Sequence, residues 1–268
     1  MLEARPDRPF WGRTWVESTF RAHLNGYDPD GSREASAEVS RLDGWSVGGC
    51  MGAETLVQSR PVARRSDDPV TDLLRAGARC SLGLFHSSPD DAPPPSAPPR
   101  VARFRRWMAV LAGPGLCEES RAGILRSLPA FLARDAARAP DSELLLLALL
   151  DRLYAATGFQ NAYAEPDALA DAIARFADDR GDEVPKALFV SDGRTLGILL
   201  GDGCLLSSHP PAELRPSGAL LSSSSEHIPA AMWMWTPQAP ATPPRDAERL
   251  GPGIFTALAA EPGVIRRR

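Results

Sequence analysis

The sequence predicts an α+β protein in which antiparallel sheets are covered by helices. Strand patterns occur in an early group and a late group, and helical patterns fall between the two groups. A regular alternation of strands and helices would instead favour a parallel sheet, and the chain does not show it. We therefore expect residues 43–110 and 186–258 to supply both sheets of the core.

The early group begins after an irregular, turn-rich segment at 1–42, which we assign to the same domain as the rest of the chain. Prolines exclude the segment at 89–100 from a ladder, because proline lacks the backbone donor. The expected elements are a strand at 44–52, its hairpin partner at 54–62, a short helix at 67–77, a strand at 78–88, a surface loop at 89–100 and one strand at 100–113.

Two or three helices are expected between the strand groups. The clearest covers 141–158, where Asp141 caps the N-terminus, Glu143 enriches the first turn in acid and Gly158 ends the helix. Its leucines make it apolar nearly all round, which predicts burial between layers. A second, amphipathic helix is expected at 167–181.

The late strands begin at Lys186. Asp-Gly pairs at 192–193 and 202–203 predict a meander of antiparallel strands over 186–208. Further strands are expected at 218–224, 231–237 and 253–258.

Composition excludes several classes of function. The 268 residues carry a net charge of −4 and 43% hydrophobic residues, and no apolar run is long enough to span a membrane. Lys186 is the only lysine, and the arginines are scattered, so we expect no nucleic-acid partner. The N-terminus lacks a secretory signal, which predicts a cytoplasmic protein with reduced cysteines. No C-x-x-C spacing supports a zinc site or a dithiol motif, and we expect neither a metal nor a cofactor.

Several short blocks, taken in order, resemble one family. They are LDGWSVGG, SDDPVTDLL, CSLGLFHSS, RRWMAVLAGPGL, APDSELLLLALLDRL, ALFVSDGRTLGILL and the tail WTPQAPATPPRDAERLGPGIFTAL. Their order and spacing resemble the stand-alone bacterial class II glutamine amidotransferases, in the group that includes the ergothioneine-pathway amidohydrolase. The resemblance implies a glutamine amidotransferase type 2-like domain at 43–268. It also implies the N-terminal-nucleophile hydrolase fold, an αββα sandwich of two antiparallel sheets between helix layers.

The family's nucleophile is missing from this chain. The resemblance requires a cysteine at position two, whose thiolate attacks the glutamine amide while its own α-amino group serves as base. Position two is Leu2, and alignment through Phe10-Trp11-Gly12 places the family's cysteine near Arg8. We therefore assign no catalytic residue.

The family's other functional positions are mostly altered. Its His-Ile-Arg, whose arginine holds the substrate carboxylate, aligns with Phe85-His86-Ser87, or with residues 86–88, so a serine replaces the guanidinium. Its oxyanion-hole Asn-Gly aligns with Gly113-Pro114-Gly115, where only Gly115 keeps a backbone donor. Asp141 matches the aspartate that receives the substrate α-amino group. The resulting vestigial pocket consists of Phe85, His86, Ser87, Gly113, Gly115 and Asp141. We expect this pocket to be shallow or occupied by the protein's own side chains.

Each surviving residue also has a structural explanation. Asp141 is a good N-cap, His86 fits a satisfied sheet residue, and Cys50 and Cys80 fit small buried thiols better than a displaced nucleophile.

The alternation at Met232, Trp233, Met234 and Trp235 predicts an edge or interface strand, with one tryptophan facing inward and the other available to a partner. We therefore predict a pseudoenzyme that binds a protein partner or forms a homo-oligomer. The alternatives are an active amidohydrolase that releases ammonia from a glutamine-type amide and a module that binds a small amine or amide.

Overall fold

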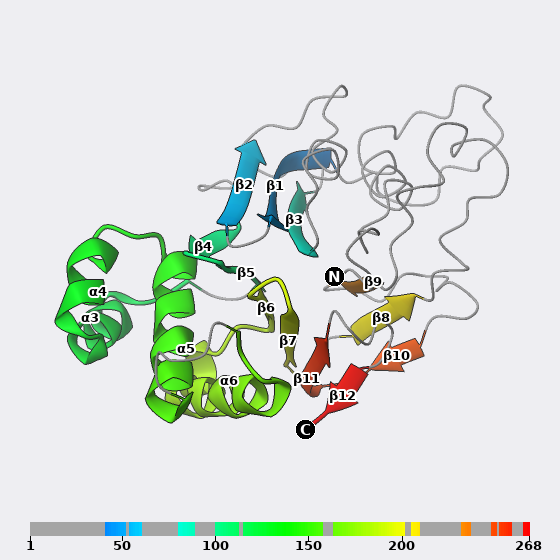
Figure 1. Cartoon of the computed structure of the whole chain (residues 1–268). Helices are drawn as coiled ribbons and strands as arrows, with labels where there is room; N and C mark the ends of the chain where they lie inside the picture. Colours follow the sequence, from blue (N-terminus) through cyan, green and yellow to red (C-terminus); the bar gives the residue numbers. More distant parts are fainter. Residues whose placement is uncertain are drawn as a thin grey trace, which may run out of the picture.

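The computed structural model describes residues 41–51, 54–60, 80–88, 100–112, 115–157, 163–201, 205–209, 232–236, 248–250, 252–258 and 265–268 (Figure 1). The described strands pair antiparallel throughout, and the helices fall between β5 and β6 in the chain. The α+β class and the order of strands, helices and strands are therefore confirmed.

The described strands are β1 Arg41–Met51, β2 Glu54–Arg60, β3 Cys80–Ser88, β4 Ala102–Phe104, β5 Trp107–Ala112, β6 Ala187–Ser191, β7 Thr195–Leu200, β8 Leu205–His209, β9 Met232–Thr236, β10 Glu248–Leu250, β11 Gly253–Leu258 and β12 Ile265–Arg267. The described helices are α3 Glu118–Ser127, α4 Ala130–Ala136, α5 Asp141–Thr157 and α6 Pro166–Arg180, followed by the short 3₁₀ helix η1 Gly181–Glu183.

These strands form three antiparallel sheets. The largest has six strands in the order β12-β11-β7-β6-β5-β4, and the two smaller ones have the orders β2-β1-β3 and β10-β8-β9. In Figure 1 the helices lie together on one side of the six-stranded sheet, where α5 contacts β4 and β5 and α6 contacts β7 and β11. The described residues thus show one helix layer against the six-stranded sheet, and among them no second helix layer covers the sheet β2-β1-β3.

The two faces of β5 show why the six-stranded sheet is covered on both sides. Trp107 and Ala109 belong to the core cluster shared with the helices. Met108, between them, points the other way, and its Sδ lies 3.2 Å from the place that a Cβ on Gly48 of β1 would take. The alternation of side chains along a strand therefore places β1 against the face opposite the helices.

The predicted single strand at 100–113 is wrong, because the chain folds there into a hairpin. Phe104 of β4 pairs with Trp107 of β5, and the turn between them contains Arg105 with a φ of 53°. This left-handed conformation is uncommon for a residue with a side chain, so sequence gave little sign of the turn.

The prediction of a meander over 186–208 is only partly correct. Asp192-Gly193 connects β6 to β7, which pair as a hairpin, and Gly193 has a φ of 90° as such a turn requires. The next strand, β8, instead pairs with β9 and β10 in another sheet. The Asp-Gly pair at 202–203 therefore does not connect hairpin neighbours.

Helix α5 is buried as predicted. Its leucines at 144–147, 149, 150 and 153 are all buried, and α3, α4 and α6 pack around it. The described helices number four rather than two or three, since α3 and α4 precede α5. Pro166 at the first position of α6 and Gly181 after its last residue fix the ends of that helix.

Other expectations lie outside the described residues. These are the helix at 67–77, the strand at 218–224, the loop at 89–99 and residues 1–40. The strand that begins the early group starts at Arg41, slightly before the predicted start. Among the described helices, none has the length and apolar character needed to cross a membrane.

Candidate functional site

Two residues of the predicted pocket lie together at the start of α5. Gly115 is in the segment that follows β5, and a Cβ on Gly115 would lie 3.5 Å from Oδ2 of Asp141. The fold brings them together because α5 packs against β5. The segment at 115–117 follows β5 in the chain and so lies near the first turn of α5. The sequence alignment had placed these two positions in one pocket.

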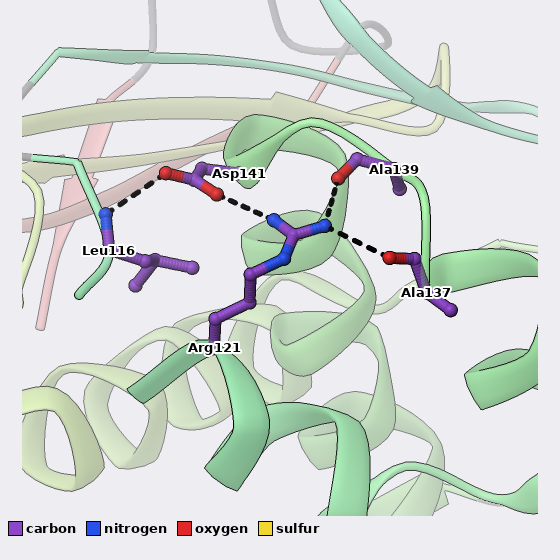
Figure 2. Close-up of polar contacts among 5 residues, drawn as sticks. All are labelled: Leu116, Arg121, Ala137, Ala139 and Asp141. Carbon is purple, nitrogen blue, oxygen red and sulfur yellow. Dashed lines mark hydrogen bonds and ion pairs between the residues drawn. The ribbon is translucent and has the colours of Figure 1, made fainter. Parts of the chain in front are cut away.

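The carboxylate of Asp141 accepts hydrogen bonds from two groups of this chain. Figure 2 shows the backbone N–H of Leu116 donating to Oδ2 at 3.0 Å and the guanidinium of Arg121 donating to Oδ1 at 2.7 Å. The side chain of Asp141 is 39% exposed, and that of Arg121 is 27% exposed. Both carboxylate oxygens are thus engaged at a site that solvent still reaches.

Arg121 also bonds to the backbone that leads into α5. Its second terminal nitrogen donates to the carbonyl oxygens of Ala137, at 3.3 Å, and Ala139 (Figure 2). One guanidinium on α3 therefore joins the connection between α4 and α5 to the first residue of α5. A planar group with several fixed donors suits this arrangement, and the compact ammonium of lysine would not reproduce it.

The predicted N-cap role of Asp141 is wrong. Asp141 is the first residue of α5, and the carbonyl of Pro140, one residue earlier, accepts the first helical hydrogen bond, from the Leu144 N–H. A capping side chain bonds to amides of its own helix, whereas the Asp141 carboxylate bonds to Leu116 and Arg121. Its structural role is to tie two segments together.

The other pocket positions are described as backbone or lie outside the described residues. In β3, Phe85 stands opposite Trp45, His86 opposite Gly44 and Ser87 opposite Leu42, with an irregularity in the register between the last two pairs. Gly113 lies outside the described residues. That these positions share one pocket with Asp141 therefore stays a prediction.

The strand predicted around Trp233 and Trp235 is present as β9. It pairs with β8 at one end of the order β10-β8-β9, which makes it an edge strand among the described strands. The expectation of one tryptophan inward and one outward is wrong, because positions two apart share a face of a strand. Trp233 stands opposite Ser208 and Trp235 opposite Leu206.

A cysteine that the sequence analysis did not single out lies beside this site. Cys117 caps α3: the backbone N–H of Ser120 donates to its Sγ at 3.4 Å, and its Sγ lies 3.2 Å from Ser120 Oγ. Hydrogen bonds from Ser120 and Cys117 hold the pKa of the Glu183 carboxyl below its usual range. The thiol is exposed, and both the Ser120 hydroxyl and the Glu183 carboxylate lie within hydrogen-bonding reach of it.

A second polar group, also missed by the sequence analysis, surrounds the turn between β6 and β7. The Asp192 carboxylate is fully buried and accepts hydrogen bonds from the backbone N–H groups of Ala164 at 2.8 Å, Thr195 at 2.8 Å and Arg194 at 2.9 Å. Thr195 Oγ1 in turn donates to the Ala164 carbonyl at 2.7 Å. The hairpin turn is thereby fixed to the segment that leads into α6.

Burial raises the pKa of the Asp192 carboxyl above its ordinary value, because the charged form loses its hydration. The three amides and nearby Arg106 act in the opposite direction but do not outweigh burial. The guanidinium groups of Arg106 and Arg194 lie 4.8 Å and 5.6 Å from the ring centre of Tyr163. This group is built as a structural clamp, because the Asp192 oxygens already bind backbone.

A small hollow lies beside the clamp on the helix side of β5. Trp107 Nε1 donates to the Tyr154 hydroxyl there at 3.2 Å. The lining residues are Trp107, Leu153, Tyr154, Thr157, Tyr163, Ala164 and Glu165. It shares no residue with the group around Asp141, and three aromatic side chains form part of its walls. Across the described ranges, no three His, Cys, Asp or Glu side chains gather in a way that could hold a metal ion.

Comparison with known proteins gives a remote likeness. The sequence matches no family model and no curated protein. One similar solved structure is a glutamine aminotransferase class-II domain protein from Silicibacter pomeroyi, with a TM-score of 0.47 and 17% identity, covering 84% of this chain and 90% of that one. Another is a predicted glutamine amidotransferase from Pseudomonas aeruginosa, with a TM-score of 0.43 and 14% identity, covering 84% of this chain and 88% of that one. At these values the likeness supports no conclusion about activity.

Proposed function

We propose that this chain is a catalytically degenerate class II glutamine amidotransferase-like protein, a pseudoenzyme whose fold serves binding or assembly with a protein partner. The proposal rests first on the sequence blocks that resemble the family and on the residues that depart from it. By that resemblance, Ser87 replaces the clamp arginine and Pro114 removes an amide donor. Groups that act as a unit in catalysis lose nearly all activity when they are lost together.

The observation that carries the proposal is that the Asp141 carboxylate is already paired with groups of this chain. The resemblance assigns this aspartate to the α-amino group of glutamine, which is a cation. In this chain the cation beside the carboxylate is the guanidinium of Arg121, at 2.7 Å, and the other oxygen accepts from the Leu116 amide. A substrate ammonium would have to displace a charge-assisted hydrogen bond and leave Arg121 without its partner.

The binding role is assigned to β9. This strand lies at the edge of its sheet among the described strands, and positions 233 and 235, two apart along the strand, share one face of it. Edge strands offer unpaired backbone groups, and tryptophan is enriched among the residues that dominate binding energy at interfaces. A protein partner or a second copy of this chain fits such a surface.

The test is ammonia release from L-glutamine by the purified full chain. We expect release no greater than that of a heat-inactivated sample, and we expect no shift in melting temperature with millimolar glutamine, since a ligand stabilises the state that it binds. The proposal is wrong if release exceeds the control and thiol alkylation abolishes it.

Cys117→Ser is the informative variant if ammonia is released. Cys117 is an exposed thiol beside Gly115, so loss of release in this variant would establish a relocated nucleophile and favour the active amidohydrolase. Retention of release in Cys117→Ser, with loss on alkylation, would assign the activity to another cysteine. Either result overturns the pseudoenzyme.

A further inference from the structure

The ladder between β1 and β3 pairs two cysteines that are distant in the sequence. Cys50 stands directly opposite Cys80. Directly opposite residues of an antiparallel pair have Cα atoms about 4.5 to 5.5 Å apart. A disulfide joins Cα atoms that are about 4.4 to 6.8 Å apart. Backbone spacing at this position therefore meets the requirement for a bond across the strands.

Both positions belong to one face of the small sheet. The Cys50 side chain is 2% exposed, and its Sγ lies 3.6 Å from the carbonyl oxygen of Arg106, in the turn between β4 and β5. Cys50 is thus on the face of β1 that packs against the six-stranded sheet. Residues directly opposite in a ladder share a face, so position 80 occupies the neighbouring place on that same face.

The surroundings of Cys50 are closely packed. A Cβ on Gly193, in the turn between β6 and β7, would lie only 2.9 Å from the Cys50 Cβ. Thr55 Oγ1 lies 3.9 Å from the Cys50 sulfur and donates to the Arg106 carbonyl at 2.9 Å. A bulky adduct on Cys50 would disturb these contacts. A bond to the neighbouring strand adds no atoms, so it is the oxidised product that this packing accepts.

We propose that Cys50 and Cys80 form a redox-active pair that closes to a cross-strand disulfide when the protein meets a small oxidant such as hydrogen peroxide. One thiol loses its proton, and the thiolate attacks one peroxide oxygen: the S–O bond of a sulfenic acid forms, the O–O bond breaks, and the leaving hydroxide takes up the proton as water. The second thiol attacks that sulfur, so that the S–S bond forms and a second water molecule leaves. Two thiols are oxidised, one peroxide is reduced, and a thiol reductant reverses the change.

The bond would stabilise the fold. It would close a loop that contains β2 and the segment between β2 and β3, and closing a loop of this kind restricts the unfolded chain. We expect the oxidised form to melt roughly 5 °C or more above the reduced form. A bond that strained the ladder would lower the melting temperature instead.

The experiment uses the full chain with Cys117→Ser, which removes the exposed thiol of the described residues. The folded protein is treated with peroxide, remaining thiols are alkylated, and the protein is digested without reductant for mass spectrometry. We expect the Cys50 peptide joined to the Cys80 peptide, with the higher melting temperature reversed by reductant. Adding Cys80→Ser should abolish the joined peptide and the shift.

Several results would overturn the proposal, and none of them depends on the Cys80→Ser variant. They are Cys50 and Cys80 both recovered alkylated, Cys50 joined to Cys204, or a joined peptide that forms only after the protein is denatured before oxidation. Glutamine hydrolysis is not part of these measurements, so they separate this proposal from the proposed function.

Discussion

At the scale of single residues, Arg121 is the side chain near the candidate site whose loss should lower the free energy of unfolding most. Arg121→Met keeps most of the aliphatic length but removes the donors to Asp141, Ala137 and Ala139. We expect the free energy of unfolding to fall by about 1 to 3 kcal/mol, with partial solvent exposure of Asp141 setting the lower end. Denaturant unfolding measures the change.

Arg126→Met is the matched control, because Arg126 lies in the last turn of the same helix and is exposed. This variant should change stability by no more than about 0.5 kcal/mol. Equal losses in the two variants would show that the bonds of Arg121 contribute nothing specific.

Asp192 gives a prediction about pH. Its folded-state pKa is raised, mainly by burial, so the folded protein holds the proton more tightly than the unfolded chain does. The stability that Asp192 contributes is therefore fully present below its unfolded pKa and is lost as the pH rises through its folded pKa. The asparagine side chain of Asp192→Asn does not titrate. The loss in free energy of unfolding that this substitution causes should therefore be largest near about pH 4 and smaller at neutral pH.

The measurement is urea unfolding of wild type and Asp192→Asn at a series of pH values. Between the unfolded and folded pKa values, the stability difference should shrink by up to about 1.4 kcal/mol per pH unit. Asp182→Asn, at an exposed position, is the control and should show no such trend. A cost that grows from pH 4 to pH 7 would contradict the raised pKa.

At the scale of elements, the close approach of α6 to β7 depends on a glycine. A Cβ on Gly197 would lie 2.6 Å from Ile173 Cδ1 and 2.9 Å from Leu169 Cδ2, so these side chains, or the helix that carries them, would have to shift. Gly197→Ala should therefore destabilise the protein by about 1 to 3 kcal/mol, as overpacking does in other cores. Thermal unfolding measures this loss.

Gly123→Ala, in α3, tests the same substitution where there is room. A Cβ there has no atom within 4 Å, and alanine is the better helix former, so stability should rise by about 0.5 to 1 kcal/mol. Opposite signs for the two variants would establish that packing, rather than chain entropy, decides the effect at Gly197. A stabilised Gly197→Ala protein would refute the close approach.

At the scale of the whole molecule, the proposed interface on β9 predicts self-association or partner binding that depends on one face of the strand. Substituting Trp233 and Trp235 together by serine should lower the association constant by at least about tenfold. The association constant is measured from the rise of the sedimentation coefficient with protein concentration. Substituting Met232 and Met234 together tests the opposite face and should have a smaller effect. A wild-type chain that stays monomeric and an equal response of both faces would each count against the interface.

Much of the secondary structure could be predicted from the sequence, because its signals are local. Asp192-Gly193 marks the turn of the β6–β7 hairpin, Pro166 and Gly181 bracket α6, and the leucines of α5 indicate a helix buried on most sides. The hairpin at Arg105 was not predicted, since a left-handed arginine carries no sequence signature. Of the candidate site, the sequence identified Gly115 and Asp141 as neighbours through a resemblance, and missed the residue that binds the carboxylate.

By itself, then, the sequence determined the α+β class and the order of its elements. Only the tertiary structure decided that Arg121 binds the carboxylate of Asp141 and that Asp192 binds the backbone of Ala164, just before α6. The same is true of the pairing of Cys50 with Cys80 across β1 and β3. The physical reason is distance along the chain. Turns and helix ends depend on a few consecutive residues, whereas these pairings depend on how strands and helices pack, which no local pattern encodes.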